Sequence, residues 1–156
     1  MFEFHGWFGL QEAAHFVDEG SRWDEIIEGI KARVAALNWG TGEYNLVAEV
    51  RLMNGEAFLH LTGNKNHRGV IGQELADLLT YVAREAPGSY GLLYWRDDEG
   101  KPPAGRWNFQ VTVMARGALS TRFDPFLSPT FPVLEVSDEG DESGQWDELF
   151  ILPTSR

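Results

Sequence analysis

The sequence predicts one α+β domain in which a mostly antiparallel sheet carries two helices on one face. Two segments repeat apolar residues with the period of an α-helix, and several others alternate apolar and polar residues with the period of a strand. Glycine, proline and asparagine residues mark turns between these segments. The predicted order along the chain is β-α-β-β-α-β-β. Because antiparallel sheets tolerate one exposed face, we expect the face away from the helices to be open.

Length and composition favour a single globular domain. A chain of 156 residues buries about two-thirds of its unfolded surface, and 43% hydrophobic with 24% charged residues is ordinary globular composition. No run of about 18 apolar residues predicts a membrane span, and Met1-Phe-Glu-Phe4 enters strand-like sequence without a secretory signal. The absence of cysteine excludes disulfides, thiolate metal sites and cysteine nucleophiles, and it agrees with a cytoplasmic location.

The formal net charge of −11 is unevenly distributed. Residues 1–134 carry 12 basic and 17 acidic side chains, whereas residues 135–156 carry 1 and 7. Such a field disfavours nucleic acid and anionic membranes as partners and favours a basic protein. Acidic proteins are also common and soluble, so charge alone leaves both interpretations open.

The first strand is predicted at Phe2–Gln11, with an apolar face and an opposite face that carries Trp7. Ser21 is a plausible N-cap for a helix over about residues 22–37. The sequence Asn38-Trp-Gly-Thr-Gly42 ends this helix.

A hairpin is predicted at residues 44–62, because Asn54-Gly55 is the strongest short signal for a two-residue type I′ turn. This turn fixes the register of the two strands. The resulting pairs on the apolar face are Leu52 with Ala57, Val50 with Leu59, and Ala48 with Leu61. On the other face Arg51 pairs with Phe58 and Glu49 with His60.

The second helix is predicted over about residues 67–85, with Asn66 as N-cap and Pro87-Gly88 as the stop. Two further strands follow. Tyr90–Asp97 is apolar on both faces, as a central strand would be, and Trp107–Arg116 alternates. In the strand Trp107–Arg116 we expect the apolar residues, which occupy the odd-numbered positions, to face the core. The residues expected on the open face of the sheet are His5, Trp7, Glu49, Arg51, Phe58, His60, Asn108, Gln110 and Met114.

The C-terminal part contains two unusual segments. Three prolines within Phe123–Pro132 exclude helix and central strand, and its apolar residues favour an extended segment packed on the core. The acidic stretch Ser137–Gly144 is expected to be a solvated loop, after which Trp146 and Phe150–Leu152 favour a return to the surface. We therefore expect a domain at residues 1–136 and an acidic extension at 137–156, partly packed on it.

Recognisable catalytic motifs are absent. The sequence has no phosphate-binding loop, dinucleotide fingerprint, His-Glu-x-x-His motif or nucleophile elbow. Its four histidines, His5, His15, His60 and His67, lack the spacing of metal ligands. We therefore predict no metal and no cofactor.

Clustered carboxylates and aromatic residues supply the remaining candidates. Arg96-Asp97-Asp98-Glu99 could hold Mg²⁺ or act as an acid/base pair, although a charged turn is the simpler interpretation. Asp124, which precedes a proline, also suits a turn. Trp7 and Trp95 are the aromatic residues most suited to anchoring a partner.

Four short motifs, in order, resemble the immunity protein 7 family. They are Phe4-His5-Gly6-Trp7; Tyr90-Gly-Leu-Leu-Tyr94 with Arg96-Asp97; Ala115-Arg116-Gly117; and Asp124-Pro-Phe-Leu-Ser-Pro129. The resemblance spans about residues 2–136. It implies a small bacterial cytoplasmic α+β protein of polymorphic or contact-dependent toxin systems, which binds and neutralises a cognate toxin. The resemblance implies no catalytic residues for this chain.

The leading hypothesis is therefore an immunity protein, not an enzyme, that binds a basic toxin domain such as a nuclease. The residues assigned to toxin binding are Trp7, Trp95, Arg96, Asp97, Asp98, Glu99 and Asp124. Two alternatives remain: a small metal-dependent hydrolase or phosphotransferase that uses the Asp97/Asp98/Glu99 cluster, and a structural or regulatory adaptor.

Overall fold

A computed structural model describes residues 1–13, 22–39, 46–100 and 108–125 of the chain. Its elements are β1 (Phe2–Leu10), α1 (Trp23–Ala36), β2 (Val47–Met53), β3 (Glu56–Lys65), α2 (Gly69–Glu85), β4 (Tyr90–Asp97), β5 (Gln110–Ala115) and β6 (Ala118–Phe123). The predicted α+β class and element order are confirmed. The structure adds β6, which follows β5 through a tight turn at Arg116-Gly117, where both residues have positive φ.

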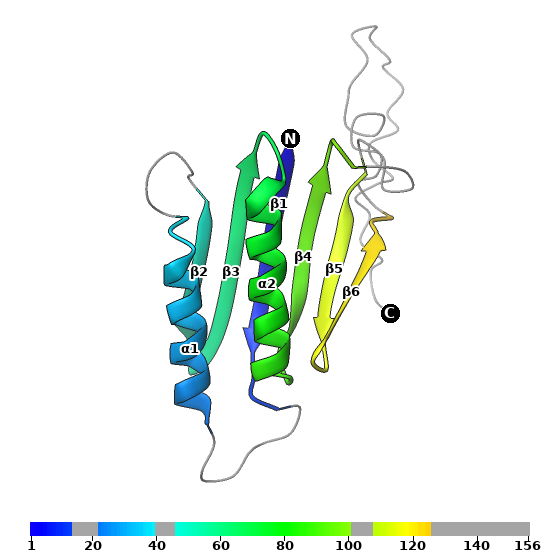
Figure 1. Cartoon of the computed structure of the whole chain (residues 1–156). Helices are drawn as coiled ribbons and strands as arrows, with labels where there is room; N and C mark the ends of the chain where they lie inside the picture. The colour runs from blue at the N-terminus through cyan, green and yellow to red at the C-terminus, as the bar shows by residue number, and fades with distance from the viewer. Residues whose placement is uncertain (14–21, 40–45, 101–107, 126–156) are drawn as a thin grey trace, which may run out of the picture.

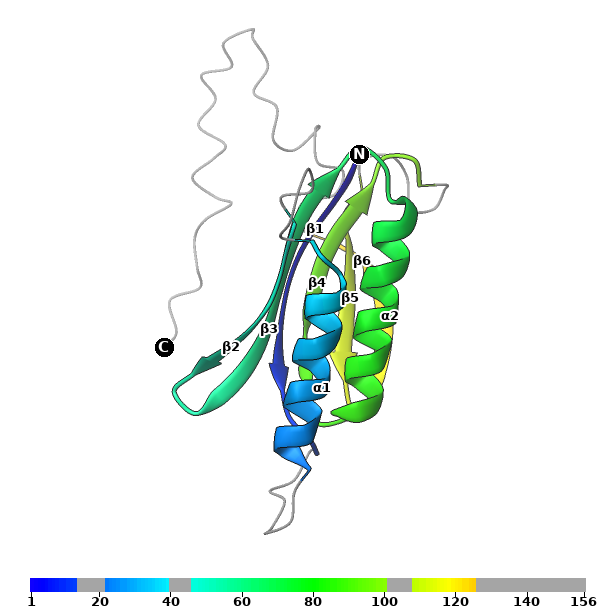
Figure 2. The same cartoon turned by 60° about the vertical axis from the view of Figure 1, so that its left-hand side comes forward.

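The six strands form one sheet in the order β2-β3-β1-β4-β5-β6, and every neighbouring pair is antiparallel. The first strand of the chain therefore lies inside the sheet, between β3 and β4. Both helices cover the same face of the sheet, α1 over the β2 side and α2 over its middle (Figures 1 and 2). We call the opposite face the open face.

The core lies between the sheet and the helices. Apolar residues with strand spacing in β1 meet residues with helical spacing in α1 and α2, as the two periodicities predict. The buried residues of these three elements include Phe2, Phe4, Phe8, Leu10, Ile26, Ile27, Ile30, Leu75, Leu78, Leu79 and Val82. Trp39 follows α1 and packs on Phe4, while its indole Nε1 donates to Glu74 Oε2 at 2.8 Å.

The predicted hairpin register is confirmed. Val50 lies opposite Leu59 and Glu49 opposite His60, and both turn residues have positive φ, 52° for Asn54 and 83° for Gly55. The carboxylate of Glu49, however, pairs with Arg51 at 2.8 Å. Residues 44–45 of the predicted strand lie outside the described part of the chain.

The prediction of which face of β5 is buried was wrong. Thr112 and Met114 are buried on the helix side, and Val111 and Val113 lie on the open face. The register with β4 explains this result, because residues directly opposite each other point to the same face. Thr112 lies opposite the buried Leu93 and Met114 lies opposite Gly91, so both side chains point to the helix side. Gln110 and Met114 are therefore not on the open face, and Asn108 precedes the strand.

The capping of α2 also differs from prediction. Asn66 does not cap this helix, which begins at Gly69 after Arg68 without a side-chain cap. Instead, the guanidinium of Arg68 lies over the ring of Trp95 at 4.8 Å, a cation–π contact that holds this side chain against the sheet. The predicted Ser21 cap, residues 126–132 of the proline-rich segment and the acidic extension at 137–156 lie outside the described residues.

Candidate functional site

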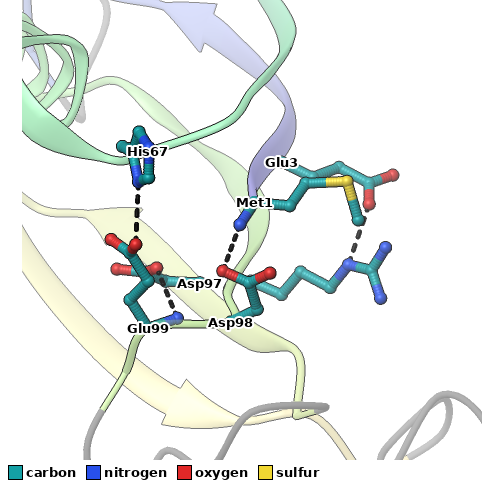
Figure 3. A network of polar contacts seen from close by, with 7 residues as sticks. Met1, Glu3, His67, Asp97, Asp98 and Glu99 are labelled. Atoms are coloured by element: carbon teal, nitrogen blue, oxygen red, sulfur yellow. Dashed lines mark hydrogen bonds and ion pairs between the residues drawn. The ribbon is translucent and has the colours of Figure 1, made fainter.

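The acidic turn Asp97-Asp98-Glu99 begins at the last residue of β4, at one end of the sheet (Figure 3). Asp97 Oδ1 accepts a hydrogen bond from the Glu99 N–H at 3.1 Å, and the Asp98 carboxylate pairs with the Met1 ammonium group. Glu99 Oε1 lies 2.7 Å from Nδ1 of His67, which is in the loop before α2. Each carboxylate thus has a different partner. This arrangement is that of an ordered turn that presents negative charge to solvent.

Arg96 belongs to a polar chain that crosses the open face. It lies directly opposite Glu3, and its Nε donates to Glu3 Oε2 at 2.9 Å. Glu3 Oε1 lies 3.1 Å from His5 Nε2, and His5 Nδ1 lies 2.8 Å from the hydroxyl of Thr62. The chain therefore joins β4, β1 and β3. Because Arg96 is buried, it is better placed to join strands than to reach a partner.

Trp7 projects from the middle of β1 onto the open face and is 44% exposed. Its ring meets that of Tyr90 edge-on, with centroids 6.1 Å apart and an interplanar angle of 82°. Edge-to-face geometry is a preferred arrangement for aromatic pairs. The exposed Trp7 side chain is therefore held in place without being buried.

Trp95 lies on the other face of the sheet. It packs beside Phe2, with ring centroids 6.2 Å apart, and its Nε1 donates to Thr112 Oγ1 at 3.0 Å. Its ring also carries the Arg68 contact described above. Because Trp7 and Trp95 point to opposite faces, one flat contact surface cannot contain both.

Asp124 follows β6 and is buried, and its N–H donates to the carbonyl of Phe109 at 3.0 Å. This bond closes the end of the β5–β6 pair. The structure thus separates the residues assigned to toxin binding into two groups. Trp7, Asp97, Asp98 and Glu99 reach solvent, whereas Trp95, Arg96 and Asp124 pack within the domain.

Sequence reasoning missed the apolar neighbours of Trp7 on the open face. Tyr90 is 43% exposed and Leu92 is 39% exposed, although both belong to the strand that is apolar on both faces. We interpreted that pattern as a central strand, and β4 does lie inside the sheet, between β1 and β5. In the structure only the face with Leu93 and Gly91 is covered by the helix layer. The two-sided apolar pattern was therefore the available signal for an exposed hydrophobic surface.

Membrane-spanning helices and metal-binding clusters are both absent from the described residues. None of the helices in these ranges has the length and apolar character needed to cross a membrane. Within the same ranges, no three side chains of histidine, aspartate or glutamate gather in a way that could hold a metal ion.

Comparison with known proteins links the chain to a protein family. A family model described as immunity protein 7 matches residues 1–136, a range that includes every residue assigned to toxin binding. No curated protein and no solved structure matches the chain.

Proposed function

The chain belongs to the immunity protein 7 family and is therefore an immunity protein against a toxin, and we propose that this toxin is a basic domain, such as a nuclease, which the chain binds one-to-one. The observation that carries the proposal is the family match over residues 1–136. We further propose that the protein acts in the bacterial cytoplasm, within a polymorphic or contact-dependent toxin system.

The charge of the chain supports a basic partner. At a net charge of −11, the protein attracts positively charged surfaces over distances of about a Debye length, roughly 8 Å at physiological ionic strength. A toxin that acts on nucleic acid needs a positive substrate site, because the phosphate backbone dominates its binding. An acidic inhibitor can occupy such a site and associate with it faster than a neutral one.

The solvent-exposed residues of the candidate site have distinct roles in this proposal. Trp7 acts as an anchor, since large aromatic side chains contribute most to interface affinity. Asp97, Asp98 and Glu99 act as charges at the rim, which mainly accelerate encounter. Burial of Arg96 and Asp124 favours a supporting role for them. The position of Trp95 beside Phe2 and Arg68 favours the same role.

A non-enzymatic role agrees with the family and with the geometry of the acidic turn. Asp97, Asp98 and Glu99 each contact a different group, and no observation favours a hydrolase or phosphotransferase at this position. The inhibitor role needs only a complementary surface that blocks the toxin.

Coexpression with the toxin domain encoded beside the gene tests the proposal. Cells that produce this toxin domain should stop growing, and cells that also produce the immunity protein should grow. The two purified proteins should elute together with a mass that corresponds to one copy of each, and the toxin domain should carry net positive charge. Growth arrest despite full production of the immunity protein would overturn the proposed function.

A further inference from the structure

We propose that the toxin docks on the open face of the sheet, on a hydrophobic strip formed by Phe58, Trp7, Tyr90, Leu92 and Val113, here called the open-face strip. This inference rests on the proposed function, since it names the surface that the toxin contacts. It differs from the sequence-based assignment, in which Trp7 and Trp95 anchored the partner together.

The strand registers make the strip continuous. Trp7 lies directly opposite Leu92, and Leu92 lies directly opposite Val113. In the adjacent row of the open face, Gly9 on β1 lies opposite Phe58 on β3 and opposite Tyr90 on β4. Only a glycine therefore stands between the side chains of Phe58 and Tyr90. Residues opposite each other across a sheet have their Cβ atoms about 5 Å apart. The strip therefore crosses four adjacent strands, β3, β1, β4 and β5. His60 lies beside it on β3, directly opposite Trp7, and its two rows contain no aspartate, glutamate, lysine or arginine on these four strands.

The strip is accessible as well as apolar. Trp7, Tyr90 and Leu92 are 44%, 43% and 39% exposed, and neither helix lies on this side of the sheet (Figure 2). Single exposed apolar residues are common on proteins, but contiguous apolar patches mark interaction sites. Exposure of two large aromatic rings and a leucine on adjoining positions of the sheet therefore favours a docking surface.

Two features keep the anchors ordered before the partner arrives. The edge-on contact between Trp7 and Tyr90 restrains both rings. The ring of Tyr90 also lies over Gly9, where a Cβ atom would come within 2.7 Å of it, so that only glycine leaves room for this orientation. Aromatic side chains that are already ordered lose little conformational entropy on binding.

Charge around the strip favours a basic partner. The acidic turn begins five residues beyond Leu92 on the same strand, or roughly 17 Å at the rise of a β-strand. A standard interface covers about 800 Å² on each partner and is thus roughly 30 Å across. One docked domain can therefore cover the strip and reach the acidic turn. A second copy of this chain would instead bring two acidic turns and two charges of −11 together.

Substitutions on the two faces of the sheet test this inference. Trp7→Ala and Leu92→Lys change the open-face strip. Phe123→Ala and Leu52→Lys are matched controls, because these residues are 49% and 66% exposed and project to the helix side. Binding of the full-length variants to the purified toxin domain encoded beside the gene is measured by calorimetry, with circular dichroism to confirm folding and size-exclusion chromatography to determine oligomeric state.

We expect each open-face variant to weaken binding at least about 30-fold, as loss of a central anchor does. The controls should change the affinity less than about threefold. Unchanged binding by folded Trp7→Ala and Leu92→Lys would overturn the docking surface while leaving the proposed function intact. An equal loss of affinity in the control variants would also overturn the docking surface. The same holds if the wild-type protein forms dimers and the Trp7→Ala substitution dissociates them. Failure of the wild-type protein to bind the toxin would contradict the proposed function itself.

Discussion

A partly buried charge pair joins the two strands on which the candidate site is built. Arg96 is buried on the open face beside the ring of Phe109, whose centroid lies 5.4 Å from the guanidinium, and its Nη1 has no hydrogen-bond partner among the described residues. Glu3 Oε2 accepts a hydrogen bond from Arg96 Nε and so offsets the buried charge. A buried charge that loses its partner is costly, because desolvation is no longer offset.

Replacement of Glu3 by alanine should therefore lower the free energy of unfolding by about 2 kcal/mol. Glu25→Ala is the matched control, since Glu25 forms an exposed pair with Arg22 and should change stability by less than about 0.5 kcal/mol. Urea denaturation followed by circular dichroism measures both. Equal effects of the two substitutions would show that the Glu3–Arg96 pair contributes no more than a surface pair.

Two glycines differ in what surrounds them, although both lie at the contact between β1 and β4. A Cβ atom at Gly91 would fall onto backbone atoms of Trp7 and Phe8, whereas one at Gly9 would meet the movable ring of Tyr90. Backbone atoms in a paired sheet cannot move aside without breaking hydrogen bonds.

Gly91→Ala should therefore destabilise the domain by about 2–3 kcal/mol, as overpacking of a core does. Gly9→Ala should cost less than about 1 kcal/mol, because rotation of Tyr90 relieves the contact. Chemical denaturation of both variants checks this order. A Gly91→Ala variant as stable as Gly9→Ala would contradict the close approach of the two strands.

The β2–β3 hairpin shows at the level of elements how a short turn determines long pairings. Asn54 and Gly55 both adopt positive φ, which matches the type I′ geometry that suits the twist of the flanking strands. A slip of one residue would turn the buried Leu59 and Leu61 outward, so the turn and the core support the same register.

Gly55→Ala should lower the free energy of unfolding by about 1–2 kcal/mol, because φ of 83° strains any residue with a Cβ. No atom of the described residues outside the turn would contact the added Cβ, so the loss reports backbone conformation. Glu56→Ala, one residue later, is the control and should have little effect. A thermal melt in which the two variants coincide would argue against the positive-φ turn.

At the scale of the whole molecule, charge and hydrophobic surface should affect different steps of binding. Neutralisation of the acidic turn as Asp97→Asn, Asp98→Asn and Glu99→Gln should lower the association rate and flatten its dependence on salt, because exposed charges steer encounter. Trp7→Ala should instead raise the dissociation rate and cost roughly 2 kcal/mol. Stopped-flow or surface-based kinetics at several salt concentrations separate the two effects.

Deletion of Ser137–Gly144 belongs to the same experiment. This segment carries Asp138, Glu139, Asp141 and Glu142, so its removal should slow association moderately and leave protection in cells intact. Binding that does not depend on salt, or a deletion variant that no longer protects cells, would contradict this division between steering and anchoring.

The sequence by itself determined the features that depend on local pattern. The order of the elements from β1 to β5, the extents of both helices, and the pairing of Val50 with Leu59 followed from periodicity and turn chemistry, which act over a few residues. The four motifs that resembled the immunity protein 7 family also lie within the range that the family model matches.

Only the tertiary structure decided how distant segments combine. The place of β1 between β3 and β4 rests on pairing with residues more than 45 positions away, which no local pattern specifies. These pairings also decide which face each side chain occupies, since a shift of one residue exchanges the two faces. Trp7 lies opposite Leu92, so Leu92 shares its face and Trp95, three residues later, lies on the other. For the same reason the alternation in β5 was visible in the sequence, but the burial of Thr112 and Met114 followed only from their neighbours Leu93 and Gly91.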